Sequence, residues 1–180
     1  MKTAHHRVLA RDMPGVIQTA TGLPLPFIRQ VIIALKKGRR IGVGRPISPT
    51  TTPRDVARIV LALSASSLGL AGDAEWRVGR LHLFAGAGKE TAETELLDLI
   101  ETAAGWHEPK IDFRHGSLLI GQTVPMLDIR GQDFAGAPVI CTYRSTEDRP
   151  ELAQSFFLLP LSALRKIARD LLPTENPEHD

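Results

Sequence analysis

The N-terminal third of the chain is organised by residues 13–45, which read MPGVIQTATGLPLPFIRQVIIALKKGRRIGVGR. Pro14 suits a first helical turn, so a short helix is expected from residue 13 to Gly22. The two prolines in Leu23-Pro24-Leu25-Pro26 prevent this helix from continuing. A second helix is predicted over residues 27–37, ending before Gly38. Its apolar stripe consists of Phe27, Ile28, Val31, Ile32 and Leu35.

The segment that follows changes character twice. Residues 39–47 are too rich in glycine for a helix and too basic for a core, which predicts a short hairpin or an exposed loop. Thr52, Pro53 and Asp55 then form a helix start, with Thr52 as the cap and Asp55 as the capping-box acid. A third helix should extend to about residue 66, with a buried face made of Val56, Ile59, Val60 and Leu63.

The small and polar residues 64–73 suggest a linker, which divides the chain into domains 1–70 and 71–180. Helices are predicted over residues 90–104 and 161–172 from their apolar spacing. Strands are predicted over residues 76–84, 111–114, 117–123, 126–129, 139–144 and 156–159. The expected fold class is therefore α+β, with antiparallel strands and a C-terminal helix in the second domain.

The charge is distributed very unevenly along the chain. Residues 1–60 contain 11 Lys and Arg but only Asp12 and Asp55, a net charge of +9. Because the whole chain carries +2, the remaining 120 residues carry −7. A block this basic attracts polyanions, of which nucleic acid is the commonest inside cells. The alternative is that the acidic and basic halves attract each other, within one protomer or between protomers.

Several function classes are disfavoured by composition. The longest apolar run, residues 31–35, is far shorter than the roughly 20 residues of a membrane span, and the N-terminus lacks a signal-peptide core. The single cysteine, Cys141, excludes a disulfide within the chain and a Cys-rich zinc site. We therefore expect a cytoplasmic protein without a membrane partner.

Residues 13–66 resemble the winged helix-turn-helix family of DNA-binding domains. The resemblance rests on the spacing of Ile17, Gly22, Ile28 and Val31, and on Leu35-Lys36-Lys37-Gly38-Arg39-Arg40-Ile41, which is similar to the stretch where a recognition helix ends and a wing begins. The order of elements, with Thr52-Pro53-Arg54-Asp55-Val56-Ala57 opening the third helix, is also similar to uncharacterised phage and prophage proteins.

The resemblance implies a set of DNA-binding residues. Arg29 and Gln30 would read base edges, because Arg pairs bidentately with guanine and Gln with adenine. Lys36, Lys37, Arg39 and Arg40 would contact phosphates, and Arg45 at the tip of a wing would reach the backbone or a minor groove. The alternative for the basic residues is that they face solvent and interact with the C-terminal helix dipole.

Features that suggest catalysis are weaker. Gly86-Ala87-Gly88-Lys89 resembles a phosphate loop, but Leu83 and Glu90 occupy the positions that need glycine and Ser or Thr. The histidines lack metal-ligand spacing, and Cys141 lies in a strand-like run without a visible base. We therefore expect no catalytic residues, no metal and no cofactor.

The expected function is that of a phage- or prophage-type transcriptional regulator, which binds double-stranded DNA as a homo-oligomer through the first domain. The acidic second domain would serve oligomerisation or partner binding. Two alternatives remain at this stage: a small-terminase-like packaging subunit, and a protein-interaction module that inhibits a host machine.

Overall fold

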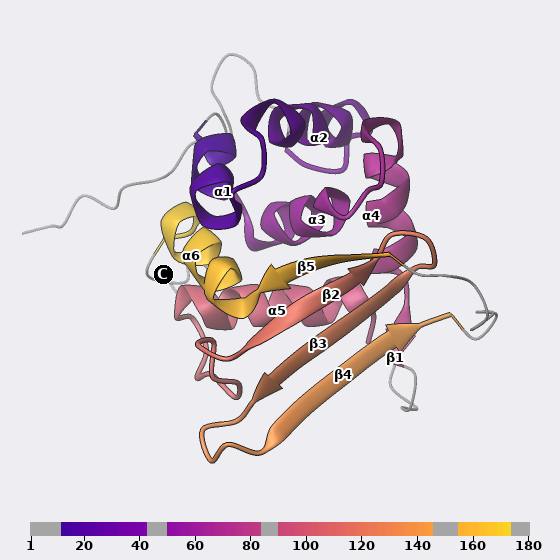
Figure 1. Cartoon of the computed structure of the whole chain (residues 1–180). Coiled ribbons are helices and arrows are strands. Elements are labelled where there is room, and N and C mark those ends of the chain that lie inside the picture. Colours follow the sequence, from indigo (N-terminus) through magenta and orange to yellow (C-terminus); the bar gives the residue numbers. More distant parts are fainter. Residues whose placement is uncertain (1–11, 43–49, 84–89, 146–154, 174–180) are drawn as a thin grey trace, which may run out of the picture.

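The computed structural model of this chain describes residues 12–42, 50–83, 90–145 and 155–173. Within these ranges the chain has six α-helices, one short 3-10 helix and a five-stranded antiparallel sheet, an α+β fold as expected (Figure 1). Helices α1 (Met13–Thr21), α2 (Leu25–Lys37), α3 (Pro53–Leu63) and α4 (Ala71–Gly79) lie above the sheet in this view, and α5 (Ala92–Ala104) lies behind it. None of the helices in the described ranges has the length and apolar character needed to cross a membrane.

The first two helices are α1 (Met13–Thr21) and α2 (Leu25–Lys37), joined by a tight turn. Gly22 has a φ of 72°, so the turn uses the left-handed conformation that glycine adopts without strain. Helix α2 begins two residues earlier than predicted. Pro26 is tolerated there because the first amides of a helix have no partner within it.

Helix α3 (Pro53–Leu63) begins as predicted. The Thr52 hydroxyl accepts a hydrogen bond from the Asp55 amide, and the Asp55 carboxylate accepts one from the Thr52 amide, which completes a capping box. The four apolar residues assigned to its buried face are all buried. The helix ends at Leu63, about one turn before the expected end.

The strand predicted over residues 76–84 is wrong for residues 76–81. Residues 71–79 form helix α4 (Ala71–Gly79) after the 3-10 helix η1 (Leu68–Leu70), and within the described residues 76–83 only β1 (His82–Leu83) is extended. The buried face of α4 includes Ala71, Glu75 and Val78, which repeat at helical spacing. The prediction failed because one member of that face is a carboxylate, so the apolar pattern alone did not reveal the helix.

The other strands are β2 (Gly116–Gly121), β3 (Met126–Gln132), β4 (Pro138–Arg144) and β5 (Phe156–Pro160). The order across the sheet is β1-β4-β3-β2-β5, and every neighbouring pair is antiparallel. Side chains on the inner face are buried: Leu118, Ile120, Leu127, Ile129, Tyr143 and Leu159. Burial, followed by the charge of Glu95 on α5, raises the pKa of Tyr143.

Residues 111–114 form a turn instead of the predicted strand. The Asp112 amide donates to the Gln132 carbonyl at the end of β3, and the Asp112 carboxylate accepts hydrogen bonds from both the side chain and the amide of Arg114. The Arg114 hydrogen bonds lower the pKa of Asp112 to about 2. A carboxylate that binds the backbone two residues ahead stabilises a turn and competes with a strand.

The hydrophobic core is continuous across the domain boundary predicted near residue 70. Helix α1 packs against α6 (Leu161–Leu171), and α3 packs against α5 (Ala92–Ala104), so elements from both predicted domains meet. One cluster of buried apolar residues extends from Met13 to Leu172. The helices of the basic half are thus held by the acidic half.

Candidate nucleic-acid interface

One side of α2 is buried and the opposite side is open. Ile28, Val31, Ile32 and Leu35 are buried against the neighbouring helices, as their spacing predicted. Arg29, Gln30 and Lys37 are exposed, and Lys36 is half-buried. Residues three and four apart are neighbours on a helix surface, so these four side chains surround Ile33, which is 43% exposed. We call Arg29, Gln30, Ile33, Lys36 and Lys37 the α2 outer face.

The position of α2 in the molecule leaves this face accessible. In Figure 1, α2 lies at the top, on the far side of α3 from the sheet. Helices α1, α3 and α4 pack against it from its buried side. In the part of the chain that the structure describes, Arg29, Lys36 and Lys37 form no ion pair.

The end of α2 has an unusual backbone. The Arg39 amide donates to the Lys36 carbonyl, and the Arg40 amide donates to the Leu35 carbonyl, which is the hydrogen-bond pattern of a Schellman motif. Its left-handed position is normally glycine, but here Arg39 occupies it with a φ of 54°. Arg39 is the only non-glycine residue with a positive φ in the described ranges. Gly38 ends the helix as predicted but has a negative φ.

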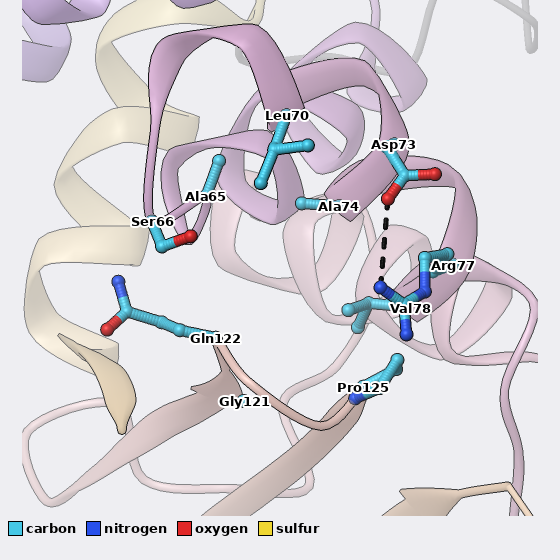
Figure 2. A pocket seen from close by; sticks show the side chains of 10 residues that line it. All are labelled: Ala65, Ser66, Leu70, Asp73, Ala74, Arg77, Val78, Gly121, Gln122 and Pro125. Carbon is cyan, nitrogen blue, oxygen red and sulfur yellow. Dashed lines mark ion pairs between the residues drawn. The ribbon is translucent and has the colours of Figure 1, made fainter. Parts of the chain in front are cut away.

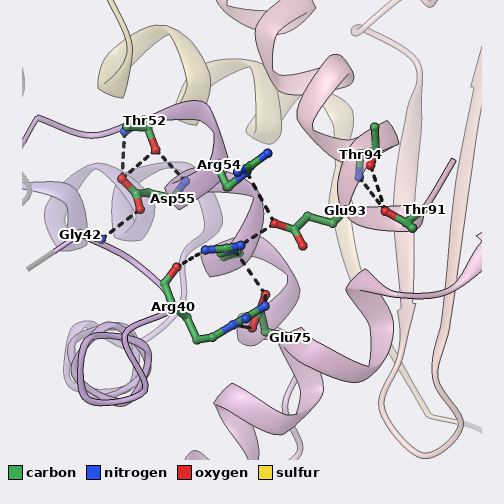
Figure 3. Close-up of polar contacts among 10 residues, drawn as sticks. Arg40, Gly42, Thr52, Arg54, Asp55, Glu75, Thr91, Glu93 and Thr94 are labelled. Atoms are coloured by element: carbon green, nitrogen blue, oxygen red, sulfur yellow. Dashed lines mark hydrogen bonds and ion pairs between the residues drawn. The ribbon is translucent and has the colours of Figure 1, made fainter.

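Arg40 points toward Glu75 on α4 (Figure 3). Its Nε and Nη2 atoms donate to the two carboxylate oxygens of Glu75 at 2.7 and 2.8 Å. Glu75 is 0% exposed and Arg40 is 32% exposed. The Glu75 hydrogen bonds raise the pKa of Arg40. The guanidinium predicted to bind phosphate thus already has a buried carboxylate partner.

Three further charged residues extend this network. Arg58 on α3 donates a hydrogen bond from Nε to Oε1 of Glu93 on α5 at 2.9 Å, and the same Nε lies 3.7 Å from Oε1 of Glu75. Its Nη1 atom donates to the backbone carbonyl of Arg40. Arg54 is exposed, and its Nε atom lies 3.9 Å from Oε1 of Glu93 (Figure 3). These contacts fix the segment after α2 against α3, α4 and α5. They also show that part of the charge asymmetry is neutralised within the protomer.

The predicted DNA-binding residues therefore divide into three groups. Arg29, Gln30, Lys36 and Lys37 lie together on the α2 outer face, and Arg39 follows directly at its end. Arg40 is paired with Glu75. Arg45 lies outside the described residues, together with the rest of the 43–47 part of the predicted hairpin or loop.

Sequence reasoning missed two residues of this region. Ile33 was not singled out because the apolar stripe drew attention to the buried side of α2. The helical periodicity places Ile33 on the side of the helix opposite the centre of that stripe, and this position could have identified it as an exposed apolar residue. Glu75 was missed because it falls between the linker predicted over residues 64–73 and the strand predicted over residues 76–84. Ala71, Glu75 and Val78 do have helical spacing in the sequence. Recognising this helix would have required treating the charged residue Glu75 as a core position.

Two hollows lie elsewhere. A pocket of about 30 Å³, enough for about one water molecule, lies where η1 and α4 meet the turn between β2 and β3 (Figure 2). A groove of about 360 Å³ lies along α5 beside Lys110, Ile111 and Phe113. Its other wall includes Glu90, Glu95 and Asp98, so this groove repels polyanions.

Cys141 is the cysteine of β4 and is half-buried. Burial raises the pKa of the Cys141 thiol, and the charge of Glu95 adds to this effect, which opposes formation of a nucleophilic thiolate. No group of three or more His, Cys, Asp and Glu side chains in the described ranges is arranged to hold a metal ion.

Comparisons with family models, with curated proteins and with solved structures found no match to this chain.

Proposed function

We propose that this protein binds double-stranded DNA through the α2 outer face and Arg39, and that it acts as a sequence-specific transcriptional regulator. Helix α1, the turn at Gly22 and helix α2 would form the helix-turn-helix, with α2 lying in the major groove. Arg29 and Gln30, nearer the N-terminal end of α2, would contact bases. Lys36, Lys37 and Arg39 would contact phosphates.

The observation that carries this proposal is the division of positive charge at α2. Arg40, Arg54 and Arg58 pair with carboxylates of the acidic half. Arg29, Lys36, Lys37 and Arg39 have no such partner in the described part of the chain, and they lie on the outer face of α2 or directly after its end. If basic residues served only to join the two halves, they would be expected to face the acidic half.

Arg39 adds a second line of support. A left-handed conformation costs a non-glycine residue about 1 kcal/mol or more, and glycine would satisfy the same hydrogen bonds without this cost. Strained residues concentrate at functional sites. A cation kept at this position, beside Lys36 and Lys37, suits a phosphate contact.

The test compares two triple variants of equal charge. In one, Arg29, Lys36 and Lys37 are replaced by Gln; in the other, Lys110, Lys166 and Arg169, which are exposed elsewhere, are replaced by Gln. Fluorescence anisotropy with labelled random-sequence duplex DNA is measured from low to physiological salt. The first variant should bind at least tenfold more weakly, with a salt slope reduced by about 2, because Lys36 and Lys37 each give up a phosphate contact that contributes roughly 0.9.

The control variant should bind nearly as well as the wild type, because its charges lie away from α2. Equal losses in both variants would mean that only net charge matters and would contradict a DNA-binding face on α2. Absence of binding by the wild type to any duplex at low salt would contradict the proposed function as a whole.

A further inference from the structure

Ile33 is an apolar residue at the centre of an otherwise polar and basic surface. It is 43% exposed, and the residues one turn away on either side are Arg29, Gln30, Lys36 and Lys37. The buried residues of α2 lie on the opposite side, so Ile33 adds nothing to the core. Helix propensity does not account for it either, because isoleucine is a weaker helix former than its lysine and arginine neighbours.

Single exposed apolar residues are common, so exposure alone assigns no role. The surroundings of Ile33 are what matter. A partner that contacts the four neighbouring polar side chains also covers Ile33 and removes the exposed part of its side chain from solvent. A partner that fits must therefore offer anionic and hydrogen-bonding groups with an apolar group between them.

The major groove of DNA has this combination. Phosphates line its edges, the base edges carry donors and acceptors, and the 5-methyl group of thymine is the apolar group on its floor. The minor groove carries no methyl group. An isoleucine in the middle of a helix that lies in the major groove is placed to cover such a methyl.

We infer that Ile33 is a specificity-determining residue that contacts the 5-methyl group of a thymine in the recognised sequence. This inference rests on the proposed DNA binding through α2 and adds the identity of one recognised base. Arg29 and Gln30 select other bases by hydrogen bonds, whereas Ile33 selects thymine by burying apolar surface.

The experiment begins with selection of bound duplexes from a random pool, which defines the preferred site of the wild-type protein. Each thymine of that site is then replaced, one at a time, by deoxyuridine, which keeps the hydrogen-bonding groups and lacks only the methyl. Dissociation constants are measured for the wild type, Ile33→Ala and Ile140→Ala. Ile140 is the matched control: it is the same residue type, 65% exposed, and lies on β4.

For the wild type, deoxyuridine at one position per recognition helix should weaken binding about fourfold, the effect of losing one buried methyl. Ile33→Ala should bind the unmodified site more weakly and should show no further loss at that position. Ile140→Ala should behave like the wild type. Circular dichroism should show that both variants are folded, because each replaces an exposed side chain.

Two results would overturn the inference while leaving DNA binding intact. In one, no thymine replacement weakens wild-type binding. In the other, Ile33→Ala shows the same loss at deoxyuridine as the wild type. Failure of the proposed function would look different, because the wild type would then select no duplex.

Discussion

At the scale of single residues, Arg39 combines a local cost with an exposed charge. Its left-handed backbone closes α2 through hydrogen bonds to Leu35 and Lys36 that glycine would allow without strain. The preceding residue, Gly38, has a φ of −75° and does not need to be glycine for this turn. The sequence LKKGRR therefore suggests the wrong residue for the left-handed position.

Arg39→Gly should raise the free energy of unfolding by about 1 kcal/mol, because glycine has no Cβ to clash in the left-handed region. The same change should weaken DNA binding and lower the salt slope by roughly 1. Urea denaturation and anisotropy measure the two effects. Arg39→Ala is the control: it removes the charge and keeps the Cβ, so binding should weaken without a gain in stability.

At the scale of elements, the start of α3 also organises the segment that follows α2. Asp55 accepts hydrogen bonds from the amide and hydroxyl of Thr52, and from the Gly42 amide at 3.2 Å (Figure 3). One carboxylate thus caps α3 and holds the chain two residues after Arg40. The cap was predictable from Thr52-Pro53-Arg54-Asp55, but the contact with Gly42 was not, because it joins residues 13 positions apart.

Thr52→Ala should lower the free energy of unfolding by about 1 kcal/mol, the usual cost of losing an N-cap side chain. Asp55→Ala should cost more, because it removes half of the capping box and the contact with Gly42 together. Urea denaturation followed by circular dichroism measures both. Equal losses in the two variants would mean that the contact with Gly42 adds no stability.

At the scale of the whole molecule, the pair between Arg40 and Glu75 joins the two halves of the sequence. It connects the end of α2 to α4 across 35 residues, and Arg58 with Glu93 makes a parallel connection from α3 to α5. The basic half is therefore partly neutralised by the acidic half, while the cations of the α2 outer face and Arg39 remain available. The charge asymmetry therefore has two components: basic residues that pair with the acidic half, and basic residues of α2 and Arg39 that could attract a polyanion.

Glu75→Gln should lower the free energy of unfolding by about 3 kcal/mol, because it leaves Arg40 without its buried counter-charge and leaves Arg58 with Glu93 alone. Urea denaturation measures the loss. The double variant Arg40→Met with Glu75→Met should recover much of it, since an apolar pair removes both desolvation costs.

Asp73→Asn is the matched control on the same helix: its partner Arg77 lies 3.7 Å away, both are about half exposed, and the change should cost less than about 0.5 kcal/mol. A cost that small for Glu75→Gln would contradict a structural role for the pair.

Local sequence signals were sufficient to predict several features of the helices. The glycine after α1, the capping box of α3 and the buried stripe of α2 depend on residues within about four positions of one another, and the structure confirms each. Only the tertiary structure showed that residues 71–79 are helical, that Arg40 faces inward and that Ile33 faces outward among cations. The physical reason is that Glu75 is stable in the core because Arg40, 35 residues away, pairs with it and Arg58 lies close by. An apolar pattern does not reveal a buried charge or its distant partner. Only the folded arrangement therefore distinguishes the basic residues that pair with carboxylates from those that remain unpaired on α2.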